Sequence, residues 1–229
     1  VNKRNMCDMT EKKMKNGDTV AALFDLDGVV FDTETQYSVF WGEIGREYHP
    51  ETDGFELKIK GQTLVQIYDR WFAGNASLQA SITDRLNDFE RRMQYDYIPG
   101  VQAFLQALKE AGVRTAVVTS SNLEKMRRVG EAHPELETLF DEILTSERFT
   151  RSKPAPDCYL LGAEVLHVGA GDCVVFEDSF HGLQAGRSAG MKVMGLATTH
   201  PAEAIRDKCD EVIPDFCDMT PEKMLRLLR

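Results

Sequence analysis

The chain has 229 residues, of which 42% are hydrophobic and 28% are charged, and its formal net charge is −10. These values are typical of an ordinary globular protein of one domain, or of one domain with a smaller insert, and they exclude a collagen-like chain or a disulfide scaffold. The excess of acidic residues disfavours nucleic acid and anionic membrane surfaces as partners.

Residues 1–17 are polar and mixed in charge without a sustained period, so we expect a mobile N-terminal extension there. The sequence has no apolar run near the ~18 residues that a transmembrane helix needs, and we expect no membrane partner. The five cysteines are odd in number and form no C-x-x-C pair. This pattern predicts free thiols in a reducing compartment, and we therefore expect a cytoplasmic protein.

From residue 18 onward, short apolar or β-branched runs alternate with helical patterns, which is typical of a parallel sheet covered by helices. The predicted strands are 20–26, 114–119, 142–144, 173–176, 192–196 and 211–213. Among the predicted helices, 101–111 has one apolar face, and a final helix begins after Thr220 with Pro221. The sequence thus predicts an α/β fold with a doubly wound, Rossmann-like parallel sheet.

Residues 34–97 interrupt this alternation between the first and second strands. They contain helical patterns at 35–47, 63–72 and 78–95 and no convincing strand. We interpret 34–97 as a helical cap inserted into a core formed by 18–33 and 98–229. The aromatic residues of this insert are expected mainly in its own core, and the charge run Glu90-Arg91-Arg92 is expected on a solvated helix face.

Two carboxylates, Asp25 and Asp27, follow the first predicted strand directly, with Gly28 after them. Side chains two residues apart on a strand point the same way, and ligands bind at the carboxyl ends of strands in open α/β sheets. Like charges this close require a cation or a shared proton. The alternative is that one of the aspartates only caps a turn or the following helix.

Three later segments also end apolar runs with polar groups. Thr119 and Ser120 offer hydroxyl and amide groups for an anion, although such residues also cap ordinary helices. Lys153 lies in a proline-fixed turn, where it can neutralise a phosphoryl group or simply lie at the surface. Glu177 and Asp178 form a second carboxylate pair. The four acidic residues together are the oxygen-rich kind of set that holds Mg²⁺.

These segments resemble, in order, the four motifs of the haloacid dehalogenase-like phosphotransferases: Asp-Leu-Asp-Gly-Val at 25–29, Thr119, Ser-Lys-Pro at 152–154, and the pair at 177–178. The resemblance extends from residue 20 to the C-terminus. It is strongest to the branch that contains β-phosphoglucomutase and small-molecule phosphatases, and the helical insert after the first motif is similar to that family's small cap domain.

The resemblance implies a role for each motif. Asp25 would be the nucleophile that forms an aspartyl phosphate, Asp27 the general acid and base, and Thr119 and Lys153 the groups that hold the phosphoryl oxygens. The implied Mg²⁺ ligands are Asp25, the backbone carbonyl of Asp27, Glu177 and Asp178. The residues implied in substrate or phosphate binding are Thr33, at the first hinge to the cap, Ser120, Lys60 and Thr63.

Two departures from the mutase pattern separate the neighbouring activities. The chain has Tyr37 and Leu64 where the resemblance leads one to expect a histidine and an arginine, and leucine cannot replace an arginine fork on a second phosphate. We therefore predict an Mg²⁺-dependent phosphohydrolase for a small phosphorylated metabolite, with β-phosphoglucomutase as the alternative. A catalytically silent phosphate-binding protein is a third reading, and we expect a monomer.

Overall fold

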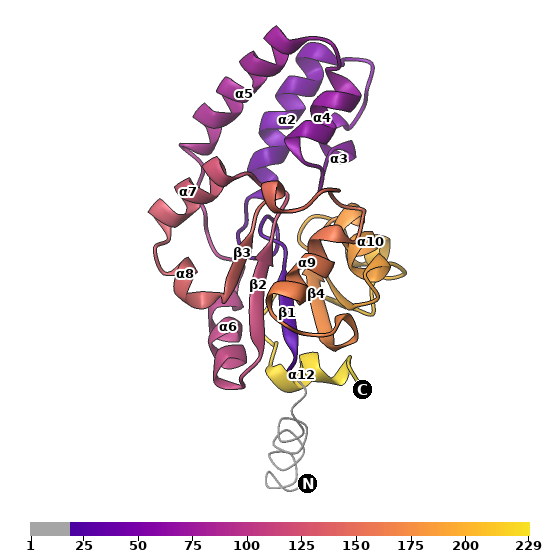
Figure 1. The fold of residues 1–229 in the computed structure, drawn as a ribbon. Helices are drawn as coiled ribbons and strands as arrows, with labels where there is room; N and C mark the ends of the chain where they lie inside the picture. The colour runs from indigo at the N-terminus through magenta and orange to yellow at the C-terminus, as the bar shows by residue number, and fades with distance from the viewer. Residues whose placement is uncertain (1–18) are drawn as a thin grey trace, which may run out of the picture.

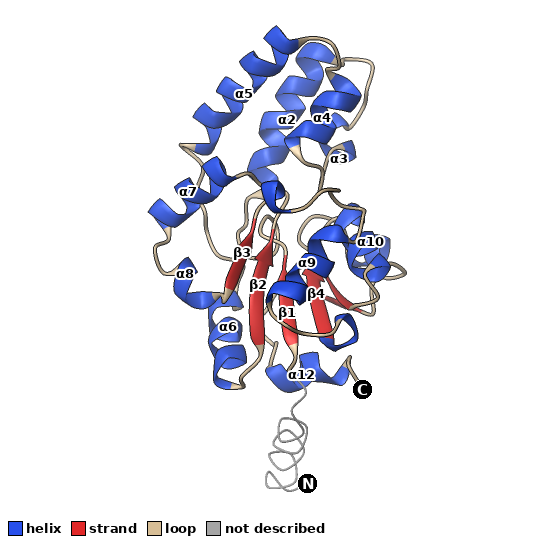
Figure 2. Cartoon of the chain, viewed as in Figure 1, coloured by secondary structure: helices blue, strands red, loops and turns tan. Residues whose placement is uncertain are grey.

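The computed structural model describes residues 19–229, so the predicted extension at 1–17 lies outside the described residues. One six-stranded sheet forms the centre, with all neighbouring strands parallel in the order β3-β2-β1-β4-β5-β6. The strands are β1 (Ala21–Phe24), β2 (Arg114–Val118), β3 (Glu142–Leu144), β4 (Cys173–Glu177), β5 (Lys192–Leu196) and β6 (Glu211–Ile213). Helices cover both faces of these strands (Figure 2), and the predicted fold class is confirmed.

Alternating side chains bury each central strand on both faces. In β1, Ala22 and Phe24 belong to one apolar cluster, whereas Ala21 and Leu23 belong to the other, as the two-residue period of a strand requires. The first cluster packs against α6 (Val101–Glu110), α7 (Leu123–Ala132), α8 (Leu136–Leu139) and α12 (Pro221–Arg226). The second packs against α9 (Asp157–Val165), α10 (Phe180–Ser188) and α11 (Ala202–Ile205).

Helices α2 (Glu34–Tyr48), α3 (Phe55–Lys58), α4 (Leu64–Trp71) and α5 (Ala76–Glu90) form a separate group beyond the carboxyl ends of the strands (Figure 1). They have an apolar cluster of their own, with Phe40, Ile44 and Ile82 inside it. The sequence did not indicate α3, which is too short to show a helical period. We call these four helices and the loops that join them the cap, and the remaining described residues the core.

Two neighbouring chain segments connect cap and core. The Asp32 amide donates to the Asp96 carbonyl oxygen at 2.8 Å, and the Ile98 amide donates to that of Val30 at 2.9 Å. Phe31 and Tyr97 form an isolated bridge between the same segments. Both crossings therefore lie side by side and form a two-stranded connection between cap and core.

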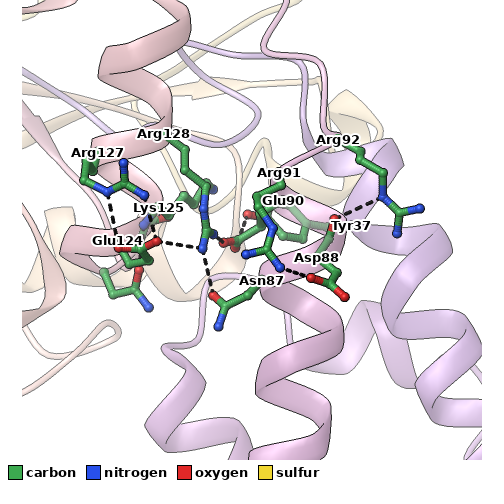
Figure 3. Close-up of polar contacts among 12 residues, drawn as sticks. Tyr37, Asn87, Asp88, Glu90, Arg91, Arg92, Glu124, Lys125, Arg127 and Arg128 are labelled. Carbon is green, nitrogen blue, oxygen red and sulfur yellow. Dashed lines mark hydrogen bonds and ion pairs between the residues drawn. The ribbon is translucent and has the colours of Figure 1, made fainter.

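A buried ion pair also joins the cap to the core. Arg128 of α7 donates from Nη1 to Glu90 Oε2 of α5 at 2.7 Å and from Nη2 to Asn87 Oδ1 at 3.1 Å (Figure 3). Both charged side chains are only 7% exposed. The prediction that this charge run lies on a solvated helix face is thus wrong for Glu90, which faces the core. It is confirmed for Arg91, which is exposed.

The Arg128→Met substitution is expected to lower the free energy of unfolding by about 3 kcal/mol, because it leaves the Glu90 carboxylate buried without its partner. Arg127 lies on the same helix with a side chain that is 58% exposed, so Arg127→Met should change stability by less than about 0.5 kcal/mol. Urea denaturation of both variants measures the difference. Equal effects would show that the buried pair does not stabilise the protein.

Among the described helices, none combines the length and apolar character needed to cross a bilayer. The cysteines Cys158, Cys173, Cys209 and Cys217 are free thiols, the first three of them buried. Cys7 lies outside the described residues.

Candidate active site

Asp25 follows β1 at the middle of the sheet. Its amide donates to the Phe176 carbonyl oxygen at 3.0 Å, which holds the residue beside the end of β4. The sheet order reverses at β1, because β2 and β4 lie on its two sides, and open α/β sheets bind ligands at such a point. Gly28 turns the chain with a φ of +74°, and a side chain there would collide with the Asp178 carboxylate.

Lys153 is a buried cation between two carboxylates. Its Nζ lies 2.5 Å from Asp25 Oδ1 and 2.7 Å from Glu177 Oε1, and it donates to the Val118 carbonyl oxygen at 3.2 Å. Burial lowers the pKa of Lys153, but the charges of Asp25 and Glu177 outweigh burial and raise this pKa. Lys153 is therefore a fixed positive charge beside Asp25.

Glu177 is held by five donors. Its Oε1 accepts from Lys153 and from the Tyr159 hydroxyl, and its Oε2 accepts from the Asp178 amide and from the amide and hydroxyl of Ser179. Gly182 makes room for it, because a Cβ at that position would overlap the Glu177 carboxylate. Glu177 thus fixes Lys153 and the start of α10 together.

Asp25, Glu177 and Asp178 each place a carboxylate oxygen within 4.8 Å of the others. Lys153 is the cation paired with this cluster, so three carboxylates and one ammonium leave a formal charge of −2. Burial raises the pKa of Asp25 to about 7, despite the opposing charge of Lys153. Burial and the nearby Glu34 raise the pKa of Asp178 as well. A divalent cation would balance this charge, and oxygen ligands suit Mg²⁺.

The Asp27 carboxylate is surrounded by hydrogen-bond donors from the core. Lys125 Nζ lies 2.5 Å from each of its two carboxylate oxygens, and the hydroxyls of Thr33 and Ser121 donate to it at 2.5 and 3.1 Å. Burial raises the pKa of Asp27, but the charge and hydrogen bonds of Lys125 outweigh burial and lower it. The contacts therefore favour an ionised Asp27.

Lys125 in turn contacts the cap. Its Nζ lies 4.5 Å from the centre of the Tyr37 ring, and the Tyr37 hydroxyl donates to Glu90 Oε1 at 2.9 Å. Glu90 is the cap partner of Arg128. A continuous set of contacts thus runs from Asp27 through Lys125 of α7 to the cap, and from the cap back to Arg128 on the same helix.

A cavity of about 1030 Å³ lies where cap and core meet, with Asp25, Asp27 and Asp178 on its core wall. Thr119 and Ser120 line it beside them. The Thr119 hydroxyl oxygen accepts from the Ser121 amide at 3.0 Å, so the loop after β2 is held in place. Asp25, Asp27, Asp178, Thr119 and Ser120 thus lie together on the wall of the cavity.

The remaining predicted binding residues have defined contacts of their own. Thr33 is fully buried and donates to Asp27. Lys60 lines the cavity but pairs with Glu34 at 2.6 Å. Thr63 also lines the cavity, and its side chain caps α4 by accepting from the Gln66 amide. Tyr37 and Leu64, the two departures from the mutase pattern, line the cavity as well.

Sequence reasoning missed Lys125. The helical spacing of α7 could have indicated it, because Lys125 and Arg128 share the buried face of this helix with Met126 and Val129. Thr199, whose hydroxyl donates to Asp178, was also missed. It lies in the loop after β5, and the sequence around it has no motif.

The sequence matches the haloacid dehalogenase-like hydrolase family over residues 19–190. It is 32% identical over 210 residues to hexitol phosphatase A from Escherichia coli strain K12, covering 88% of this chain and 93% of that protein. It is 30% identical over 187 residues to the phosphorylated carbohydrates phosphatase of Thermotoga maritima, covering 75% of this chain and 82% of that protein.

Solved structures share the fold, among them the following two. A haloacid dehalogenase-type hydrolase of family IA from Entamoeba histolytica aligns with a TM-score of 0.78 at 22% identity, over 92% of this chain and 99% of that one. A β-phosphoglucomutase from Clostridium difficile aligns with a TM-score of 0.75 at 21% identity, over 92% and 97%. Because the family match covers most of the chain, this chain belongs to the haloacid dehalogenase-like hydrolases and is an enzyme of that family.

Proposed function

We propose that the protein is a phosphohydrolase that cleaves the monoester of a small phosphorylated metabolite through an aspartyl phosphate. The observation that carries this proposal is the placement of Asp25 at the sheet's switch point, paired with Lys153, with Asp27 and an open cavity beside it. The two phosphatases of phosphorylated sugars and sugar alcohols among the relatives support it.

The proposed reaction has two displacements at phosphorus. In the first, an Asp25 oxygen bonds to phosphorus, the ester P–O bond breaks, and the leaving alkoxide takes a proton from Asp27. In the second, water bonds to phosphorus and gives its proton to Asp27 while the bond to Asp25 breaks and phosphate leaves. Lys153 and the loop at Thr119 and Ser120 would stabilise the phosphoryl oxygens throughout.

The surroundings of Asp27 suit both steps. Its contacts with Lys125, Thr33 and Ser121 favour the ionised form, which is the form that accepts a proton from water. A bound phosphate dianion adds negative charge beside Asp27 and raises the pKa of its carboxyl, which favours the protonated form needed first.

The residues present fit a divalent cation. Asp25, Asp178 and Glu177 would hold Mg²⁺ together with the Asp27 carbonyl, and the ion would neutralise charge between nucleophile and substrate when bound. Because the Glu177 oxygens already accept five hydrogen bonds, we expect Asp25 and Asp178 to be the stronger ligands.

Mg²⁺ is expected to raise the melting temperature more at pH 8 than at pH 5. The pKa of Asp25 is about 7 in the folded protein, above its ordinary value of 3.8, so without metal the folded state loses stability as the pH rises through this window. Mg²⁺ binds the deprotonated cluster and reverses that loss. At 100 times its Kd, the expected rise at pH 8 is roughly 5–10 °C.

Calorimetry with and without Mg²⁺ at both pH values measures this effect. The Asp178→Asn variant should reduce the rise, whereas Asp207→Asn, at a side chain that is 76% exposed, should keep it. A rise of equal size at pH 5 and pH 8 would contradict the proposed ligand set.

The activity test follows two products in the same reaction. A panel of sugar phosphates with Mg²⁺ is assayed for inorganic phosphate and for isomerised sugar phosphate, with a trace of glucose 1,6-bisphosphate in the β-glucose 1-phosphate sample. Phosphate release from any ester, together with acid-stable phosphate on Asp25, supports the phosphohydrolase. Isomerisation without phosphate release would assign the mutase instead, and binding without turnover would assign the catalytically silent protein.

A further inference from the structure

The cavity extends beyond the residues that would bind the phosphoryl group, which we call its phosphate end. Asp25, Lys153 and the loop at Thr119 account for the phosphoryl group, and the cap supplies most of the remaining wall. A volume of about 1030 Å³ leaves room for an alcohol of hexose size. If the proposed function is correct, the charges along this remaining wall determine which alcohols fit.

The basic side chains that line the cavity, among residues 19–229, are Lys60, Lys125 and Arg151. Each has a carboxylate partner. Lys60 lies 2.6 Å from Glu34, Lys125 contacts Asp27 through both oxygens, and Arg151 donates to both oxygens of Asp157 at 3.0 and 2.8 Å. The side chains of Lys60 and Lys125 are 9% and 3% exposed, so burial holds these two in their pairs.

The acidic side chains on the same wall outnumber these bases. They are Glu34, Glu56, Glu90 and Glu147, in addition to the aspartates of the phosphate end. Glu34 and Glu90 are paired with Lys60 and Arg128, whereas Glu56 and Glu147 form no ion pair among residues 19–229. A second anionic group on the substrate would meet these two carboxylates and find no basic side chain of the described wall without a partner. Placing like charges together in a partly desolvated site costs binding free energy.

Apolar side chains form much of the rest of the wall. Those from the cap are Trp41, Ile59, Leu64, Val65, Ile67 and Leu86, and the core adds Phe149, Pro154 and Ala155. Val65 is 67% exposed and lines the cavity, so its side chain presents apolar surface to a ligand there. The hydrocarbon face of an uncharged alcohol fits this surface.

We propose that the site takes phosphate monoesters whose alcohol carries no further ionised group, and that it discriminates against bisphosphates and phosphorylated carboxylic acids. The inference rests on the proposed phosphohydrolase function. It concerns the cap end of the cavity, whereas the chemistry concerns the core end.

Three matched pairs of esters test the proposal. Glucose 6-phosphate is compared with 6-phosphogluconate, fructose 6-phosphate with fructose 1,6-bisphosphate, and glycerol 3-phosphate with 3-phosphoglycerate. The readout is kcat/KM from phosphate release with Mg²⁺, and p-nitrophenyl phosphate serves as a reference ester. In each pair that reacts, the neutral alcohol is expected to be preferred by at least about tenfold.

A variant tests the physical reason. Val65→Lys adds a positive charge to the cavity wall at an exposed position, and it should raise the ratio of kcat/KM for 6-phosphogluconate to that for glucose 6-phosphate by about tenfold. Val39→Lys is the matched control, since Val39 is 60% exposed on α2 and outside the cavity lining. Its ratio should equal that of the unmodified protein.

The outcomes separate the two proposals. Equal or better turnover of the anionic ester in any pair would overturn the inference and leave the phosphohydrolase standing. An unchanged ratio in Val65→Lys would likewise overturn it, because charge would not be the basis of selection. No phosphate release from any ester, p-nitrophenyl phosphate included, would overturn the proposed function and the inference with it.

Discussion

Asp25→Asn is expected to reduce phosphate release by at least about 10⁴-fold, because an amide cannot form the proposed covalent bond to phosphorus. The fold should remain. The introduced amide oxygen can still accept a hydrogen bond from Lys153, and Lys153 keeps its 2.7 Å contact with Glu177. The measurements are the steady-state rate and the amount of acid-stable phosphate bound to the protein.

The control for this substitution is Asp207→Asn, which removes one carboxylate at an exposed position of the core and should leave the rate unchanged. Circular dichroism and the melting temperature establish that Asp25→Asn is folded. A folded variant that retains a tenth or more of the activity would remove Asp25 as the nucleophile, whatever the identity of the substrate.

The strands of the core were predictable because buried parallel strands have a recognisable sequence pattern. The predicted bounds of three strands, at 142–144, 192–196 and 211–213, agree with β3, β5 and β6, and the other three differ by at most two residues. Central parallel strands are buried on both faces, so they are short continuous apolar runs. The cap was harder, since its short helix at residues 55–58 has less than two turns in which to show a period.

The core end of the site was predictable for a related reason. The carboxyl ends of parallel strands meet at one edge, so polar residues at the ends of β1 and β4 must come together there. Asp25 and Glu177 do so, with Lys153 between them. Position at the end of a strand therefore identified the two carboxylates without any knowledge of their contacts.

The cap end was not predictable in this way. Charged residues on amphipathic helices have the same appearance in a sequence whether they face water or a partner helix, so Glu90 was assigned to a solvated face. Its partner Arg128 lies on α7, 38 positions later in the chain. Only the packing of cap on core shows that the two side chains meet and that Lys125 lies beneath Tyr37.

Lys125→Met is expected to lower kcat at neutral pH by about 10- to 100-fold and to move the acidic limb of the pH profile upward by about one unit or more. Burial raises the pKa of Asp27, and Lys125 is the main opposing influence that lowers it. Without the ammonium, the Asp27 carboxyl takes up a proton at a higher pH. Because the second displacement needs ionised Asp27, activity is lost at a higher pH as well.

Two variants separate this effect from loss of structure. Lys125→Arg keeps a positive charge near Asp27 and should keep the acidic limb near its original position, although the bulkier group lowers kcat. Lys109→Met removes an exposed lysine from α6 and should change neither quantity. A rate lowered equally at every pH in Lys125→Met would contradict the argument, because a purely structural role for Lys125 reduces the amount of competent enzyme without changing the proton affinity of Asp27.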